Sequence, residues 1–242
     1  MATHPSALVR RAWQPLMVGV AAVALVVGFA PWRTVEGATF LAPPSLTPAA
    51  AYNAPAGDVA VLSGGCFWGL QGVFEHVKGV KQVLAGYAGG GAATANYELV
   101  STGTTGHAES IKVIFDPAQI SYAEILRIYF SVATDPTQVG GQYPDQGTQY
   151  RGEIWYANPA QKAVAERYIA QLTAAKAFHR PITTRVDAYS GFYPAEAYHQ
   201  DYLVHHPDAP YIATYDMPKV DALKKYFGAE WRPAPILALA SR

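Results

Sequence analysis

The hydrophobic period of the chain changes abruptly between residues 59 and 77, from that of a strand to that of a helix. Residues 59–62 form a short apolar run that ends at Gly64-Gly65, which is typical of a buried strand followed by a turn. Apolar residues then recur at every third or fourth position, as on one face of a helix: Phe67, Leu70, Val73, Phe74 and Val77. The pattern predicts a strand, a tight turn and an amphipathic helix, with Cys66 in the first helical turn.

Cys66 is the single cysteine of the 242-residue chain, so it has no partner for a disulfide within the chain. The unpaired N–H groups and the positive dipole end of a helix N-terminus favour an anion. This position therefore predicts a lowered thiol pKa and a larger fraction of nucleophilic thiolate. Gly64 and Gly65 lack a Cβ, which lets a substrate approach the sulfur. A reactive thiol is the leading hypothesis, and the alternative is a buried cysteine that packs as a small inert side chain.

A second chemical candidate, Glu109, lies on a predicted strand at residues 107–115. Alternation places it on one face with three apolar side chains: Ile111, Val113 and Phe115. Burial disfavours a charged carboxylate and raises its pKa, so Glu109 could hold a proton near neutral pH and act as a general acid. The alternative is a glutamate at the strand end that reaches solvent or pairs with Lys112 or His107.

Further strands and helices alternate along the chain without a regular repeat. Helices are expected to begin at Ser121 and at Asn158, which are typical N-cap residues. Strand patterns occupy three more stretches, residues 79–87, 153–156 and 183–189. Residues 135–151 are irregular, and their polar side chains could line a cleft: Asp145, Gln149 and Tyr150. The alternation predicts an α+β fold in which a mixed sheet is flanked by helices.

The composition argues against several classes of function. Lys plus Arg and Asp plus Glu both number 18, so the formal net charge is zero. Because the cations form no stripe either, nucleic-acid binding is not expected. The glycine-rich residues 86–91 lack the spacing of phosphate-binding loops. No metal site is expected, because His199, His205 and His206 match no metal-ligand spacing and fit surface or core positions better.

The N-terminal part of the chain has the composition of an export segment. Arg10-Arg11 precede an uncharged stretch, residues 15–32, made largely of Val, Ala, Leu and Gly. Residues 1–37 are predicted to be a signal peptide or an N-terminal membrane anchor, residues 38–57 an Ala/Pro-rich linker, and residues 58–242 the folded domain. We expect an exported protein, either in the bacterial periplasm or membrane-anchored and facing the periplasm.

Four short motifs occur in order along residues 59–227: Gly65-Cys66-Phe67-Trp68-Gly69, Gly86-Tyr87-Ala88-Gly89-Gly90, Thr105-Gly106-His107-Ala108-Glu109 and Gly147-Thr148-Gln149-Tyr150-Arg151. With them the chain closely resembles the A-type peptide methionine sulfoxide reductases. A lone Cys-Phe-Trp motif would carry little weight, whereas four ordered motifs are specific. The resemblance implies the ferredoxin-like two-layer core of that family and makes residues 58–242 its catalytic domain.

The resemblance implies thiol-dependent reduction of the S epimer of methionine sulfoxide, free or in proteins, and hence repair of oxidised proteins under oxidative stress. Cys66 would attack the sulfoxide sulfur and become a sulfenic acid, while Glu109 would donate a proton to the sulfoxide oxygen. By the same resemblance, Phe67 and Trp68 would enclose the S-methyl group. Tyr97 and Tyr150 would hydrogen-bond the sulfoxide oxygen, and Asp145 would orient the polar end of the methionine.

The chain departs from many relatives, which carry C-terminal cysteines that convert the sulfenic acid into a disulfide. Cys66 has no such partner, so its sulfenic acid would have to react with an external thiol, such as glutathione, a thioredoxin-like protein or dithiothreitol. The resemblance implies no bound cofactor. The implied partners are oxidised proteins, free methionine sulfoxide and the thiol reductant.

Two other functions remain open on the sequence. A cysteine hydrolase would use His107 or His199 as the base that activates Cys66, where the reductase needs a carboxylic acid. A non-catalytic module that binds oxidised methionine would explain the missing resolving cysteine. A buried Glu109 beside Cys66, with no histidine in reach, would favour the reductase.

Overall fold

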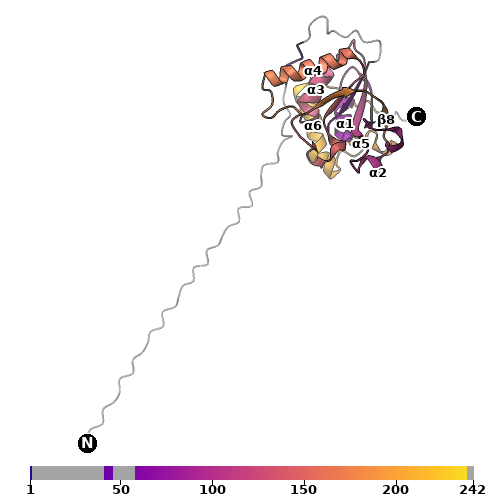
Figure 1. Ribbon diagram of the computed structural model, residues 1–242. Coiled ribbons are helices and arrows are strands. Elements are labelled where there is room, and N and C mark those ends of the chain that lie inside the picture. Colours follow the sequence, from indigo (N-terminus) through magenta and orange to yellow (C-terminus); the bar gives the residue numbers. More distant parts are fainter. Residues whose placement is uncertain (2–40, 46–57, 239–242) are drawn as a thin grey trace. The chain divides into compact units, whose positions relative to one another are not determined.

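Figure 1 shows the chain in a computed structural model, which describes Met1, residues 41–45 and residues 58–238. The chain divides into two units, Met1–Arg33 and Thr34–Arg242. The predicted signal peptide or anchor lies outside the described residues except for Met1, and so does the predicted linker except for residues 41–45. No helix in the described part is long and apolar enough to cross a membrane.

The described part of the second unit alternates strands and helices. Its strands are β1 (Asp58–Ser63), β2 (Val80–Ala88), β3 (Ala108–Phe115), β4 (Gly141–Gln142), β5 (Asp145–Gln146), β6 (Glu153–Tyr156), β7 (Arg185–Ala188) and β8 (Phe192–Pro194). Its α-helices are α1 (Phe67–Glu75), α2 (Tyr97–Val100), α3 (Tyr122–Ile128), α4 (Pro159–Ala174), α5 (Tyr202–His205) and α6 (Met217–Tyr226). Two π-helical turns, Tyr129–Ala133 and Ile212–Asp216, adjoin α3 and α6.

Six strands form one sheet in the order β7-β6-β1-β3-β2-β8. Neighbouring strands are antiparallel except β6 and β7, which are parallel, so the prediction of a mixed sheet is confirmed. The central strands β1 and β3 are buried along most of their length. This burial on both faces explains why β1 is a continuous apolar run in the sequence.

The main apolar core lies between one face of this sheet and the helices α1, α3, α4 and α6 (Figure 1). Helix α1 supplies four of its most buried side chains, at most 1% exposed: Phe67, Leu70, Val73 and Phe74. The other face of the sheet carries a smaller cluster made of Val61, Ala88, Ala108 and Trp155. This sheet-and-helix layering gives the predicted α+β class.

The helices begin where the sequence indicated. Ser121 accepts a hydrogen bond from the N–H of Glu124 at the start of α3, and Asn158 caps α4 with Pro159 in the first turn. Three elements after residue 190 were not predicted: β8, α5 and α6. The first two have three and four residues, which is too short for a hydrophobic period to appear.

The C-terminal segment that follows α6 is bound along α1. The N–H of Arg232 donates to the carbonyl of His76 at 2.8 Å, and that of Ile236 donates to the carbonyl of Glu75 at 3.0 Å. The rings of His76 and Trp231 stack with centroids 4.7 Å apart. These contacts make the C-terminal segment part of the folded unit rather than a free tail.

Two buried acidic side chains meet near Ala238, the last described residue of this segment. The Ala238 N–H donates to Asp201 Oδ1 at 2.7 Å, and Glu75 lies against Asp201. Burial, with a hydrogen bond to Asp201 and its charge, raises the pKa of Glu75 to about 9. Because burial and the neighbouring carboxyl group both disfavour its charged form, Glu75 is protonated at neutral pH.

Glu75→Gln should reduce the pH dependence of folding stability. The pKa of Glu75 is higher in the folded than in the unfolded chain, so its contribution is complete below the unfolded value of 4.5 and is lost as pH rises toward about 9. The parent should therefore lose up to about 1.4 kcal/mol per pH unit more than the variant across this window. Denaturant unfolding at a series of pH values measures this. Equal slopes for the parent and Glu75→Gln would contradict it, and Glu98→Gln, at an exposed position, should match the parent.

Candidate active site

Cys66 is the N-cap residue of α1, where the chain leaves β1 and turns into the helix. The turn needs glycine at the two preceding positions. Gly65 has a φ of +95°, in the left-handed region that favours glycine, and a Cβ on Gly64 would lie 2.8 Å from Thr134 Oγ1. Gly64 therefore packs closely against Thr134 and Gly65 against Gln142, and this packing positions Cys66 at the start of the helix.

The Cys66 thiol is buried, with 8% of the residue exposed. Burial raises its pKa well above the ordinary thiol value, and the charges of Glu109 and Asp216 add to the rise. The N–H of Trp68 and the ammonium of Lys219 lower it. The expected net lowering by the helix N-terminus is therefore wrong, because burial and two carboxyl groups outweigh the N–H group.

Glu109 is 3% exposed and lies on the buried face of β3, as alternation predicts. Its Oε2 accepts a hydrogen bond from the backbone N–H of Phe67 at 3.0 Å, which joins it to the residue after Cys66. Burial raises the pKa of Glu109 to about 8, and Asp145 and Asp216 contribute, although the Phe67 N–H opposes the shift. Glu109 is therefore mostly protonated at neutral pH.

The bases near Glu109 in the sequence are engaged elsewhere. His107 Nδ1 accepts from the Gly90 N–H at 3.2 Å, and its Nε2 lies 3.0 Å from a backbone carbonyl oxygen. Lys112 Nζ lies over the ring of Phe192, 5.7 Å from its centroid. Glu109 is therefore neither solvent-exposed nor paired with His107 or Lys112, so the alternative interpretation of this residue is wrong.

Aromatic rings surround the half-buried Trp68. Its indole N–H donates to His199 Nδ1 at 3.2 Å, and its ring stacks on Tyr202 with centroids 3.9 Å apart and planes at 14°. The Tyr211 ring meets it edge-on at 6.2 Å. Phe67 is a core side chain by comparison, with 1% exposed. Trp68 is thus the better placed of the two to present an apolar surface.

Two predicted tyrosines come to this site from separate short helices, Tyr97 from α2 and Tyr150 from a 3-10 turn. The Tyr97 ring packs against His199 at 4.6 Å between centroids. Burial raises the pKa of the Tyr150 hydroxyl, and the charges of Glu109 and Cys66 raise it further. A hydroxyl that stays protonated and lies within the electrostatic reach of both groups is a hydrogen-bond donor for a polar ligand.

Asp145 on β5 completes the predicted set. It accepts a hydrogen bond from the Tyr211 hydroxyl, and burial raises its pKa even though Tyr211 and Lys219 lower it. The fold therefore brings together all seven residues that the sequence singled out: Cys66, Phe67, Trp68, Tyr97, Glu109, Asp145 and Tyr150.

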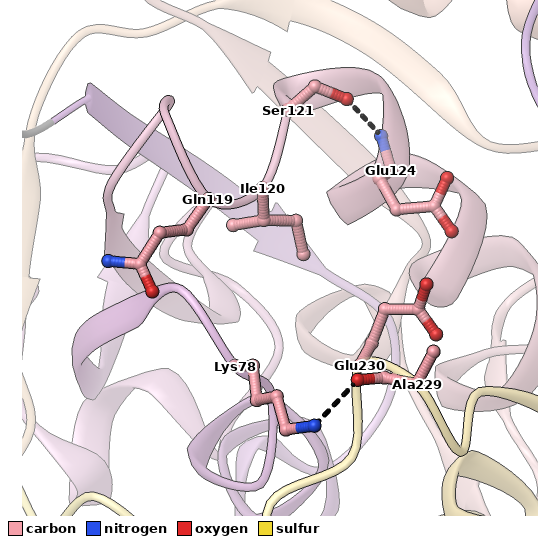
Figure 2. A pocket seen from close by; sticks show the side chains of 7 residues that line it. All are labelled: Lys78, Gln119, Ile120, Ser121, Glu124, Ala229 and Glu230. Carbon is pink, nitrogen blue, oxygen red and sulfur yellow. Dashed lines mark hydrogen bonds between the residues drawn. The ribbon is translucent and has the colours of Figure 1, made fainter.

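A separate surface cavity has a volume of about 550 Å³ and contains none of these seven residues. Figure 2 shows the side chains that line it. It is lined by Lys78, Gln119, Ile120, Ser121, Glu124, Ala229 and Glu230. No thiol lies in it, so the chemistry belongs to the site around Cys66. Within the described residues, no group of three or more His, Cys, Asp or Glu side chains could hold a metal ion.

A family model described as peptide methionine sulfoxide reductase matches residues 58–231. The chain belongs to this family. The protein named peptide methionine sulfoxide reductase MsrA 2 from Mesorhizobium japonicum is 50% identical over 188 residues, which are 78% of this chain and 96% of the relative. An MsrA 2 from Synechocystis sp. is 52% identical over 170 residues, 70% of this chain and 79% of that protein.

Solved structures agree with the family. Methionine sulfoxide reductase A of Corynebacterium diphtheriae is 33% identical, with a TM-score of 0.55 over 65% of this chain and 78% of that one. Mxr1 from Saccharomyces cerevisiae in reduced form is 27% identical, with a TM-score of 0.58 over 71% of this chain and 94% of that one. The reductase is thus an A-type oxidoreductase with the α+β fold of its family.

Sequence reasoning gave no role in the reductase site to five residues from the C-terminal part of the chain: His199, Tyr202, Tyr211, Asp216 and Lys219. The sequence predicts a surface or core position for His199, and it is a core residue, 2% exposed, that contacts Trp68. The other two histidines considered for metal binding, His205 and His206, are exposed. The missed residues carry no local spacing signal, because long-range packing places them beside Trp68 and Cys66.

His199→Leu should weaken turnover of methionine sulfoxide by the reductase. Burial lowers the pKa of His199, so the neutral ring accepts the indole N–H of Trp68, and leucine would leave that donor without a partner. We expect kcat/KM to fall ~10-fold, from an energetic cost of about 1–3 kcal/mol. His199→Gln, which keeps an acceptor, should lose less, and the exposed His205→Leu should match the parent. Equal losses in the Leu and Gln variants would contradict the hydrogen-bond role.

Proposed function

We propose that the chain reduces the S epimer of methionine sulfoxide, free and within proteins, through a Cys66 sulfenic acid, and so repairs oxidised proteins. The observation that carries the proposal is the hydrogen bond from the Phe67 N–H to Glu109. It joins a buried carboxylic acid, with a pKa raised to about 8, to the residue next to the single thiol. A nucleophile and a proton donor then face the same bound group.

The reaction balances between these two groups. The Cys66 thiolate attacks the sulfoxide sulfur while Glu109 gives its proton to the sulfoxide oxygen, which weakens the S–O bond. The attack forms an S–S bond between Cys66 and the substrate. The hydroxyl then passes from the methionine sulfur to Cys66 Sγ as this S–S bond breaks, so methionine departs with its sulfur reduced by two electrons and Cys66 becomes a sulfenic acid. A protonated carboxyl is needed for this step, because a sulfoxide oxygen leaves readily only after it has taken up a proton.

The surrounding residues fit a small ligand that is apolar at one end and polar at the other. Trp68 would enclose the S-methyl group, with Phe67 behind it in the core. Tyr97 and Tyr150 would donate hydrogen bonds to the sulfoxide oxygen. Asp145, fixed by Tyr211, would orient the polar end of the methionine residue.

An external thiol would restore the enzyme, because the chain has no second cysteine. One thiol attacks the sulfenic acid to give a mixed disulfide and water. A second thiol then releases reduced Cys66 and leaves with the first as a disulfide. Glutathione, a thioredoxin-like protein or dithiothreitol meets this requirement.

We place the reductase outside the cytoplasm, in the bacterial periplasm or anchored in the membrane and facing it. The support for this location is the sequence Arg10-Arg11 followed by the uncharged residues 15–32. An oxidising compartment also suits the repair of sulfoxides.

The hydrolase alternative is not favoured by the geometry. The Nδ1 atoms of both His107 and His199 accept hydrogen bonds, from Gly90 and Trp68, so neither can take a proton from Cys66 there. The proposed binding module shares the site with the reductase and differs only in turnover.

Turnover of separated epimers tests the function. The full-length chain with excess dithiothreitol should convert the S epimer of a methionine sulfoxide substrate to methionine and leave the R epimer unchanged. Cys66→Ser should abolish conversion while the protein stays folded. If the folded parent converts neither epimer, the proposal fails and the non-catalytic binding module takes its place.

Glu109→Gln tests the general acid. The variant should lose about 10²–10⁴-fold in the rate of the sulfoxide step, yet Cys66 should still react with iodoacetamide. In the parent, the proton on Glu109 is present below its pKa, so the acid-dependent limb of the rate should fall as pH rises through about 8. Single-turnover rates across this range measure both effects. A variant as fast as the parent would remove Glu109 from the mechanism.

A further inference from the structure

A buried ion pair lies against the first turn of α1 and has no part in the proposed reaction steps. Lys219 Nζ on α6 is 2.9 Å from Asp216 Oδ1, and the two side chains are 14% and 0% exposed. A Cβ on Gly69 would overlap Asp216 Oδ1 and would lie 3.1 Å from Lys219 Nζ. Glycine at this position therefore lets both charges approach the helix start, one turn from Cys66.

The pair is not arranged for stability alone. Removing two charges from water costs several kcal/mol per ion, which pairing repays only when the remaining polar atoms are also bonded. Asp216 Oδ2 is buried and has no hydrogen-bond partner among the described residues. A buried, incompletely satisfied charge beside a reactive group is characteristic of functional sites.

Charged and titratable groups from several elements act on the Cys66 thiol. Those that oppose its ionisation are carboxyl groups, Glu109 on β3 and Asp216 before α6, whereas Lys219 favours ionisation. Three further groups are coupled to the thiol or to these carboxyls: Tyr150, Tyr211 and Asp145. Although burial lowers the pKa of Lys219, the charges of Asp216 and Cys66 raise it overall, so Lys219 remains a cation.

We propose that Lys219 is a positioning residue for the thiol: its ammonium, held by Asp216 against Gly69, stabilises the anionic form of Cys66. The inference rests on the proposed function, in which Cys66 is the nucleophile. Helix α6 thus supplies a positive charge near Cys66. The N-terminus of α1 alone does not offset the effect of burial on the thiol. Asp216 has two opposing effects, because it fixes the ammonium and also repels the thiolate.

The pH dependence of Cys66 alkylation by iodoacetamide tests the proposal on the full-length chain. Cys66 is the single thiol, so the midpoint of the rate profile reports its ionisation directly. Lys219→Met should move the midpoint up by ~1 pH unit, the lower end of the shift expected from removing a nearby opposite charge. Lys219→Arg, which keeps the charge, should stay near the parent.

Asp216→Asn supplies a test of opposite sign. The amide keeps an oxygen acceptor for Lys219 but removes the negative charge, so the midpoint should move down. A purely structural role for the pair would not shift the two variants in opposite directions. Lys224→Met, at an exposed position on the same helix, should leave the midpoint unchanged.

An unshifted midpoint in Lys219→Met, or shifts of the same sign in Lys219→Met and Asp216→Asn, would overturn the proposal. Should Lys219→Met fail to fold, a Lys219→Arg midpoint at the parent value and a lowered Asp216→Asn midpoint would still support it, and any other combination would overturn it. Alkylation needs no sulfoxide. Absence of epimer turnover with the expected midpoints would therefore defeat the proposed function and leave this inference standing.

Discussion

The site depends on one hydrogen bond, from the Phe67 N–H to Glu109 Oε2. The N–H is one of the unpaired donors that every helix N-terminus presents, and a buried carboxyl on the neighbouring strand satisfies it. This contact places the start of α1 against the middle of the sheet and puts a proton donor beside Cys66. It also stabilises the charged form of Glu109, yet burial keeps the pKa raised to about 8. The group is thereby held near the point where it can both give up and regain a proton.

A second network, made of buried side-chain hydrogen bonds, fixes the C-terminal half of the site against β2 and α1. The Gln200 side chain accepts from the Ala85 N–H at 2.9 Å and donates to the Ala85 carbonyl at 2.9 Å. Gln71 on α1 donates to Gln200 Oε1 at 3.2 Å and accepts from the Asp201 N–H at 3.0 Å. These bonds are buried. Breaking one leaves a buried donor or acceptor without a hydrogen-bond partner, at a cost of about 1–3 kcal/mol. The neighbouring His199 is positioned by the sheet and α1 together.

The sequence predicted what short periods encode. Alternation put Glu109 on the buried face of β3, and the change of period put Cys66 at the start of α1. Sequence reasoning failed for the pKa of Cys66, which depends on several groups that are distant in the sequence. The helix N-terminus alone favours a lower thiol pKa, but burial and the carboxyls of Glu109 and Asp216 reverse the sign, and Asp216 reaches the site only through packing of the C-terminal helix. Sequence spacing did not place His199 beside Trp68, because that contact comes from long-range packing.

The lack of a second cysteine and the burial of Cys66 are physically related. In the proposed mechanism, the sulfenic acid cannot form an internal disulfide and must survive until an external thiol arrives, and burial limits its contact with further oxidant. Burial also raises the pKa of the Cys66 thiol and so reduces the fraction of thiolate, which is the nucleophile of the proposed mechanism. In the role that we propose for Lys219, a fixed cation beneath the helix start counteracts this loss without opening the site to solvent. The site has to keep Cys66 buried and also favour its thiolate. The ion pair of Asp216 and Lys219 is compatible with both, since Gly69 lets it reach the first turn of α1 from inside the fold.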